Sequence, residues 1–307
     1  MSCQKEILFE HSNIKSLSIR RTTCLVGYLG TYYVFDTLWS TFADSASPRR
    51  RIMKHSSVPV PSRADVMAAC ALRGPLANGI PYNSDIWVKY GTGVTEAEAI
   101  LQQFVNENAD HSIVYTPKVY DYFTGQRISD IPVTYIVMER VYGEALTSKE
   151  DDTVLENIAA AVRHIWELPL PPQASIGPLA GQVPYNRFFS DYGAGRTFQS
   201  TEELQAWINE KLKEEGWPDR VDLPSERCIC HCDLSQFNIL RGNPVIIIDW
   251  GMSGVYPRIF DEFALFHQFN LRGSKFAKAL HKKLFGNKLP RHLRPLTIVS
   301  RINTWGS

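Results

Sequence analysis

Two short apolar stretches near residue 240 are flanked by an Asp, an Asn and a second Asp, and this pattern constrains the fold more than any other in the chain. The sequence is HCDLSQFNIL over residues 231–240 and NPVIIIDWG over residues 243–251. Gly, Asn and Pro in the RGNP segment between the stretches favour a turn. β-Branched residues at 245–248 favour a buried strand. The pattern therefore predicts an antiparallel hairpin with strands at 237–240 and 245–248.

The predicted hairpin brings three polar residues to one place. The first residue of one antiparallel strand lies beside the last residue of the other, so Asn238 and Asp249 are expected at the same open end. Asp233 lies in the loop that leads into this end. Two carboxylates and an amide oxygen suit a hard cation such as Mg²⁺, and a carboxylate outside the metal shell can orient or deprotonate a hydroxyl. This is the division of labour that phosphoryl transfer needs. The alternative is that these residues only cap a loop and end a strand.

The same segment resembles a known family. HCDLSQFNIL followed by VIIIDWG is similar to the catalytic segment of the aminoglycoside phosphotransferase and choline kinase group, in particular its fungal branch, which is related to protein kinases. Cys232 stands where the family pattern His-Gly-Asp-Leu has Gly. The resemblance implies that Asp233 is the catalytic base and that Asn238 and Asp249 are magnesium ligands. It also implies that His231 braces the loop by hydrogen bonds.

The family also requires a strand lysine and a helix glutamate upstream. The stretch DIWVKYG (85–91) alternates apolar and other residues and predicts a strand that carries Lys89 near its end. Thr95 is expected to be a helix N-cap, with Glu98 at capping-box spacing. By the resemblance, Glu98 pairs with Lys89, and Glu96 is the fallback.

The resemblance places the adenine of ATP at a hinge between two lobes. The stretch YIVMERVYGEAL (135–146) resembles the strand that leads into this hinge. The residues implied to line the adenine slot, mainly through backbone groups, are Met138, Glu139, Arg140 and Val141. The loop that covers the nucleotide is expected within LRGPLANGIPYNSD (72–85), which lacks a G-x-G-x-x-G pattern. Pro75 and Pro81 cannot donate a backbone N–H to a phosphate, so weakened ATP binding is expected.

The segment between the hinge and residue 231 is expected to form the acceptor pocket. Apolar spacing predicts helices over 152–168 and 201–216. The residues that suggest the pocket are Tyr185, Arg187, Phe188, Phe189, Tyr192 and Trp207. The aromatic residues fit an organic acceptor, including a cationic one through cation–π contact, and they equally fit a plain core.

Composition limits the other functions. The chain has 307 residues, 44% of them hydrophobic, with 33 basic and 32 acidic side chains, which is typical of a globular protein long enough for two lobes. A net charge of +1 gives no reason to expect nucleic-acid binding. Cys228, Cys230 and Cys232 share one face of a strand and His231 the other, which disfavours a zinc site. Reduced thiols and the lack of a signal-peptide pattern indicate a cytoplasmic protein.

The N-terminal region has an apolar pattern of its own. Aromatic and aliphatic residues recur at helical spacing over 24–42, which predicts an amphipathic helix, and a polar linker is expected over 43–62. Packing on the small lobe is favoured. The alternative is peripheral membrane contact, in which Arg20, Arg21 and the 49–51 arginine run would meet anionic lipid.

Together these patterns and the resemblance imply an α+β, two-lobed, protein-kinase-like fold. Its small lobe would be an antiparallel sheet plus a helix, and its large lobe would be mainly helical. The expected organisation is an N-terminal helix and linker (1–62), a small nucleotide lobe (63–140) and a large catalytic and acceptor lobe (141–307). The implied activity is ATP- and Mg²⁺-dependent phosphorylation of a hydroxyl on a small organic molecule. Two alternatives stay open: an inactive kinase relative that acts as a binding module, and a membrane-associated choline- or lipid-type kinase. The acceptor and the oligomeric state are left undetermined.

Overall fold

The computed structural model describes residues 58–73, 78–128, 131–189, 193–268, 274–287 and 290–305. The amphipathic helix expected over 24–42, most of the linker after it and the arginines proposed to meet lipid lie outside these residues. Within the described ranges, no helix is both long and apolar enough to cross a membrane.

The small lobe is an antiparallel sheet with strand order β1-β2-β5-β4. Its strands are β1 (Gly79–Pro81), β2 (Ile86–Gly91), β4 (Val119–Ile128) and β5 (Ile131–Glu139). The predicted strand at 85–91 is confirmed as β2. Its alternation separates two faces: Ile86, Val88 and Tyr90 are buried, while Lys89 lies on the opposite face.

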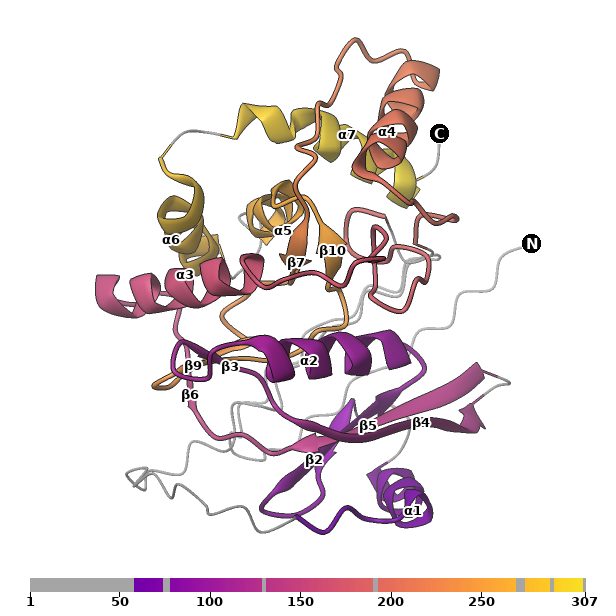
Figure 1. Ribbon diagram of the computed structural model, residues 1–307, viewed down its shortest axis with the longest axis vertical. Coiled ribbons are helices and arrows are strands. Elements are labelled where there is room, and N and C mark those ends of the chain that lie inside the picture. The colour runs from indigo at the N-terminus through magenta and orange to yellow at the C-terminus, as the bar shows by residue number, and fades with distance from the viewer. Residues whose placement is uncertain are drawn as a thin grey trace, which may run out of the picture. The chain divides into compact units, whose positions relative to one another are not determined.

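Helix α1 (Arg63–Arg73) covers the outer face of this sheet (Figure 1). Val66 and Cys70 lie one helical turn apart and pack against the buried residues of β2. The helix begins at a local cap, in which the Asp65 backbone N–H donates to Ser62 Oγ at 3.2 Å. The sequence pattern of 63–73 was not recognised as a helix, although Ser62 and Asp65 at this spacing are the signal of one.

Of the segment 72–85, in which the covering loop was expected, the structure describes residues 72–73 and 78–85. Helix α1 ends at Arg73, and β1 pairs antiparallel with β2, with Gly79 opposite Lys89. The turn between β1 and β2 lies against the end of β5. Tyr142 Oη donates to Ser84 O at 2.7 Å, and Arg140 Nη1 donates to Asn83 O at 2.9 Å. These tertiary hydrogen bonds hold the turn at the hinge.

Helix α2 (Glu96–Asn108) lies between the small-lobe sheet and the helical large lobe (Figure 1). The predicted N-cap is confirmed, because Thr95 Oγ1 accepts the Glu98 backbone N–H at 3.2 Å. Ala99 packs against the sheet, while Leu101 and Val105 belong to the core of the large lobe. One helix therefore connects both hydrophobic cores.

A second small sheet carries the hairpin that dominates the sequence. Its strands, in the order β3-β9-β8-β6, are β3 (Val114–Tyr115), β9 (Val245–Ile247), β8 (Ile239–Arg241) and β6 (Glu144–Ala145). Strands β8 and β9 pair antiparallel with Ile239 opposite Ile247, so the predicted hairpin is confirmed. Two further strands, β7 (Cys228–Cys230) and β10 (Gly254–Tyr256), pair just outside the hairpin.

Helices form most of the large lobe, and the predicted α+β organisation, with an antiparallel sheet and helix in the small lobe and a mainly helical large lobe, is confirmed. They are α3 (Asp152–Trp166), α4 (Thr201–Glu214), α5 (Ile259–Gln268), α6 (Ser274–Phe285), η2 (Arg291–Leu293) and α7 (Arg294–Trp305). Phe188 and Phe189 are 1% exposed and stack among Phe198, Trp207 and Phe260. The core alternative is therefore correct for Phe188, Phe189 and Trp207, whereas Tyr185 lines a cavity described below and Tyr192 lies outside the described residues.

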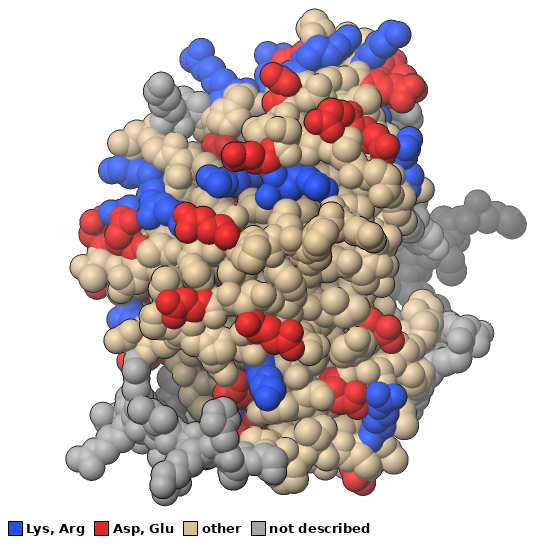
Figure 2. Space-filling view, in the orientation of Figure 1, with Lys and Arg blue, Asp and Glu red and all other residues tan. Residues whose placement is uncertain are grey.

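Charged side chains of both signs are interspersed over the face shown in Figure 2. On α3 and α6, for example, Lys283 Nζ lies 2.8 Å from Asp152 Oδ1, and Arg163 Nη1 lies 3.0 Å from Glu156 Oε1. Such exposed pairs contribute little to stability.

Candidate active site

The loop over 231–238, called the catalytic loop below, is held in place by His231. The Asp233 backbone N–H donates to His231 Nδ1 at 3.2 Å, and His231 Nε2 lies 3.1 Å from the Ile248 carbonyl oxygen. A backbone N–H can only donate and a carbonyl can only accept, so the ring is neutral with its proton on Nε2. Both nitrogens are engaged, so the ring connects the loop to strand β9 and has no nitrogen left for substrate.

A second brace comes from Asp261 in the first turn of α5, a role that sequence analysis missed. Its Oδ1 accepts the Cys232 backbone N–H and its Oδ2 accepts Trp166 Nε1, each at 2.7 Å. Asp261 is 1% exposed. Burial raises the pKa of its carboxyl above the ordinary value, against the lowering effect of these two hydrogen bonds. Because each oxygen faces an N–H donor, the ionised form fits this place.

Cys232 itself has a left-handed backbone, with φ of 58°. This conformation is open to Gly and costs most other residues about 1–2 kcal/mol. A Gly, which the resembled pattern has here, would adopt this conformation without the steric cost. Here a Cys occupies the position with its side chain buried in the large-lobe core.

Asp233 and Asn238 meet inside the loop. Asn238 Nδ2 donates to both the backbone oxygen and Oδ2 of Asp233, each at 2.9 Å. Since the amide nitrogen is directed at Asp233, the amide oxygen is the Asn238 atom suited to a hard cation. The Ile248 backbone N–H donates to the Asn238 carbonyl oxygen at 2.9 Å. Asn238 therefore lies opposite Ile248, the residue directly before Asp249. Asp249 leaves the strand with φ of 64°, an uncommon conformation of the kind that gathers at functional sites.

Lys89 joins the small lobe to this end of the hairpin. Its Nζ contacts Asp249 Oδ1 at 2.7 Å and also pairs with Glu98 Oε1 in α2. Glu98 is 3% exposed and was the first choice for the lysine partner; the fallback residue Glu96 lies elsewhere, within 3.4 Å of Thr124 Oγ1. The structure therefore brings together residues 160 positions apart.

The charges of these three groups depend on one another. Burial by itself would lower the pKa of the Lys89 ammonium, but the charges of Asp249 and Glu98 raise it above its ordinary value. Burial likewise opposes the ionisation of Asp249, yet Lys89 outweighs it and holds the pKa of that carboxyl below its ordinary value. For Glu98, burial dominates and raises the pKa despite Lys89. The ammonium therefore stays charged and is shared between two carboxyl groups.

The hinge residues named from the sequence point in different directions. Met138 is 7% exposed and packs on the α2 side of the sheet, where its sulfur lies 3.5 Å from Gln102 Nε2. Glu139 accepts hydrogen bonds from the Tyr115 hydroxyl and from the Lys118 backbone N–H. Val141 packs against a cluster formed by Leu240, Ile246 and Ile248 of the hairpin. Leu240 lies on the strand that follows Asn238, and Ile246 and Ile248 lie on the stretch that leads to Asp249. The apolar surface of the hinge therefore continues along both strands of the hairpin. The predicted role of these residues at adenine stays a prediction.

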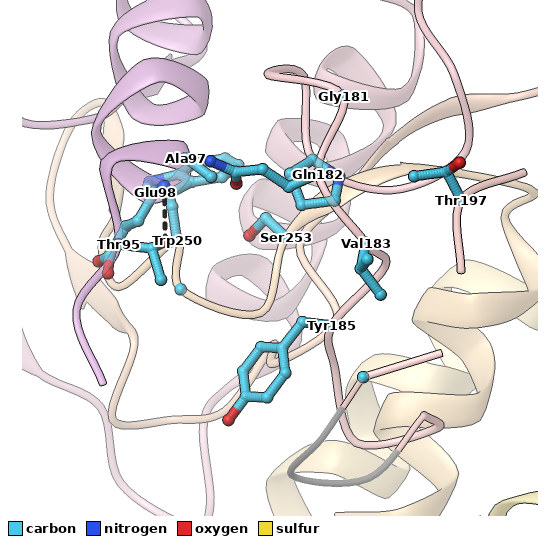
Figure 3. Close-up of a pocket in the computed structure, with 13 residues that line it drawn as sticks. Thr95, Ala97, Glu98, Gly181, Gln182, Val183, Tyr185, Thr197, Trp250 and Ser253 are labelled. Atoms are coloured by element: carbon cyan, nitrogen blue, oxygen red, sulfur yellow. Dashed lines mark hydrogen bonds between the residues drawn. The ribbon is translucent and has the colours of Figure 1, made fainter. Parts of the chain in front are cut away.

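A cavity of about 600 Å³ is lined in part by Glu98, one of the two partners of Lys89 (Figure 3). It is bounded on one side by Glu98 of α2 and the N-cap Thr95, and on the other by the 178–197 segment, with Gln182 reaching across it. Trp250 and Ser253 contribute from the segment after Asp249, and Ser253 Oγ donates to His231 O at 3.0 Å. Its volume is within the range of small-molecule sites.

The chain was compared with solved structures, curated proteins and family models. Solved structures that match it include aminoglycoside phosphotransferase APH(4)-Ia, at 15% identity and TM-score 0.47, covering 77% of this chain and 88% of that one. Another is aminoglycoside phosphotransferase APH(3'')-Id from Streptomyces rimosus in complex with ADP and streptomycin, at 18% identity, TM-score 0.43 and coverage of 79% and 98%. Spectinomycin phosphotransferase APH(9)-Ia in complex with ADP and spectinomycin matches at 16% identity, TM-score 0.43 and coverage of 75% and 79%.

A search of curated proteins found no significant match. The model of the phosphotransferase enzyme family, by contrast, matches residues 94–295, which are 202 of the 307 residues and span the sequence from the start of α2 to α7. This match includes the catalytic loop, the hairpin and Asp249. The chain therefore belongs to the phosphotransferase enzyme family.

Proposed function

We propose that this protein uses ATP and Mg²⁺ to phosphorylate a hydroxyl group of a small organic molecule. The observation that carries the proposal is the continuous set of contacts that links Lys89, Asp249, Asn238 and Asp233. Lys89 contacts Asp249 at 2.7 Å, the hairpin sets Asn238 beside that end, and Asn238 contacts Asp233 at 2.9 Å. A phosphoryl-transfer site needs a cation for phosphates, oxygen ligands for magnesium and a carboxylate for the acceptor, and this set contains all three.

The donor set fits magnesium. Asp249 supplies a carboxylate whose pKa lies below its ordinary value, and Asn238 supplies an amide oxygen. Hard oxygen ligands of this kind, completed by water and phosphate oxygens, are what Mg²⁺ takes in proteins. When bound, the ion would neutralise charge on the phosphates of the nucleotide.

The other residues act through hydrogen bonds and charge. Lys89, released in part from Asp249, would bind phosphate oxygens of ATP while Glu98 keeps its ammonium in position. Asp233 would accept or orient the proton of the acceptor hydroxyl. Its carboxylate is held in position by the hydrogen bond that Asn238 Nδ2 donates to Asp233 Oδ2. His231 and Asp261 would keep the backbone of the catalytic loop rigid.

The test is magnesium-dependent ATP binding and slow ATP hydrolysis, measured on the wild type, Asp249→Asn and the control Asp152→Asn. Asp152 has a side chain that is 86% exposed on α3, so its substitution removes a carboxylate without touching the site. We expect Mg²⁺ to strengthen ATP binding in the wild type and in the control. In Asp249→Asn this strengthening should fall by about tenfold or more, and hydrolysis should be lost. Equal behaviour of Asp249→Asn and wild type would refute the assignment.

One observation favours a second candidate, a binding module without turnover. Strand β1, which precedes the Lys89 strand, spans three residues and ends in Pro81, which has no backbone N–H to donate to a phosphate. Fewer backbone donors over the nucleotide would leave its phosphates more open to water. The discriminating result is tight, magnesium-dependent nucleotide binding by the wild type with no hydrolysis above that of the Asp249→Asn variant.

A further inference from the structure

Arg187 makes a contact that the predicted site did not include. Its Nη2 donates to Asp233 Oδ1 at 2.9 Å, while Asn238 Nδ2 donates to the other oxygen, Oδ2, at 2.9 Å. The pair joins residues 46 positions apart, and the side chains of Arg187 and Asp233 are 39% and 13% exposed. The guanidinium therefore reaches the candidate base from the solvent side of the loop.

The backbone that carries Arg187 is anchored, although its side chain is exposed. Its carbonyl oxygen lies 3.3 Å from Ser300 Oγ of α7, and the next carbonyl, that of Phe188, accepts Asn303 Nδ2 at 3.0 Å. Phe188 is also held by Asn186, whose Oδ1 accepts its backbone N–H at 2.9 Å, and its ring is buried in the core. Because the backbone is held in place and the guanidinium is partly exposed, the Arg187 side chain can move to another hydrogen-bond partner without a change in the backbone. The Arg187 side chain is 39% exposed, so water can solvate the guanidinium when it leaves Asp233, which lowers the cost of breaking the ion pair.

We propose that Arg187 binds the phosphoryl group while it passes from ATP to the acceptor, an inference that rests on the function proposed above. An acceptor hydroxyl must lie about 3 Å from Asp233 to give up its proton, and the phosphorus about 3–3.5 Å beyond that oxygen. A guanidinium that touches Asp233 is therefore within one side-chain rotation of the phosphoryl oxygens. Its planar set of donors matches two of these oxygens at once, which a lysine cannot do.

The distribution of cations supports this role. Lys89 is already shared between Glu98 and Asp249 on the nucleotide side. In the part of the chain that the structure describes, Arg187 is the cation that pairs with Asp233. Charge that develops on the transferring group is stabilised most by a donor already placed beside it.

The chemistry balances without any covalent change in Arg187. The acceptor oxygen forms a bond to the γ-phosphorus, and the bond from that phosphorus to the β–γ bridging oxygen breaks with its electron pair going to ADP. The acceptor proton goes to Asp233. Arg187 only moves its hydrogen bonds from Asp233 to the phosphoryl oxygens, which also frees Oδ1 for the hydroxyl.

ATP hydrolysis, with water as the acceptor, tests the proposal without knowledge of the natural substrate. The full chain is compared with Arg187→Met, Arg187→Lys and the control Arg220→Met, an exposed arginine between α4 and β7 whose Nη1 donates to the Trp217 carbonyl oxygen at 2.9 Å. We expect Arg187→Met to lower kcat about a hundredfold while KM for MgATP changes less than about threefold. Arg187→Lys should recover part of the loss, and Arg220→Met should match the wild type.

Binding of MgADP with and without aluminium fluoride, a mimic of the phosphoryl group in transfer, provides a second readout. Wild type should bind MgADP more tightly with the fluoride, and Arg187→Met should lose this gain while it keeps its affinity for MgADP alone. An active wild type with an Arg187→Met variant that hydrolyses ATP equally well or faster would overturn the inference, since Arg187 would then only restrain Asp233. A wild type that binds no MgATP would overturn the proposed function itself, and with it this inference.

Discussion

Asp261→Asn should be among the most damaging isosteric substitutions outside the candidate reacting groups. The carboxylate of Asp261 is 1% exposed and accepts two hydrogen bonds of 2.7 Å, one from the Cys232 backbone and one from Trp166 Nε1. An asparagine has the same shape but only one acceptor oxygen, so its NH₂ group must face one of the two N–H donors. One buried donor is therefore left without a partner, and a charge-assisted hydrogen bond is lost.

The expected cost follows from these contacts. A hydrogen bond to a charged group contributes about 1.5–3 kcal/mol, and an unsatisfied buried donor costs about 1–3 kcal/mol. The two figures overlap, and relief of the buried charge offsets part of the loss. We therefore expect the free energy of unfolding to fall by about 2–3 kcal/mol.

Urea unfolding at pH 7 measures this change, with linear extrapolation to zero denaturant. Asp152→Asn is the control, because its carboxylate is 86% exposed on α3 and its removal should cost less than about 0.5 kcal/mol. The reasoning also predicts that Asp261→Asn lowers ATP hydrolysis at temperatures where the variant is folded, since Cys232 directly precedes Asp233. A loss of less than about 0.5 kcal/mol for Asp261→Asn would refute the account of Asp261 as a brace.

Two further predictions concern the ion pairs and the loop backbone. Lys89→Met should lower the free energy of unfolding by about 2 kcal/mol or more at pH 7, because it leaves Glu98 and Asp249 facing each other. The lowered pKa of Asp249 stabilises wild type at pH values above the ordinary value of 3.8, and this contribution is lost only as pH falls below that value. The deficit should therefore persist in urea unfolding at pH 5 and shrink at pH 3; a deficit independent of pH would contradict this. Cys232→Gly should change stability by no more than about 1 kcal/mol, because relief of φ at 58° offsets the lost buried thiol, whereas Cys232→Val should cost about 2 kcal/mol. Equal urea midpoints for the Gly and Val variants would show that backbone conformation is unimportant there.

Local patterns in the sequence predicted the elements that carry the site. Alternation over 85–91 indicated β2, the Thr95 cap indicated the start of α2, and the RGNP turn with its flanking apolar stretches indicated the β8–β9 hairpin. These features depend on residues close together in the chain, for which turn chemistry, capping and periodicity are direct physical causes. Helix α1 was missed even though its cap at Ser62 is equally local.

Contacts between distant residues were outside the reach of such patterns. Lys89 and Asp249 were associated only through the family resemblance, since no local rule joins residues 160 positions apart. The aromatics at 188 and 189 fitted either a pocket or a core, and only packing against Phe198 and Phe260 placed them in the core. The contacts of Arg187 and Asp261 with the catalytic loop had no signal in the sequence.

Local sequence patterns are therefore enough to specify these short elements and the polar residues that the hairpin gathers at one end. They are enough because strand alternation, turn residues and helix caps act within a few residues. Tertiary structure alone decided which distant side chains complete the site: Arg187 on Asp233, and Asp261 beneath Cys232. The reason is physical, because a buried carboxylate or an exposed guanidinium finds its partner only after the core has fixed the helices that carry them.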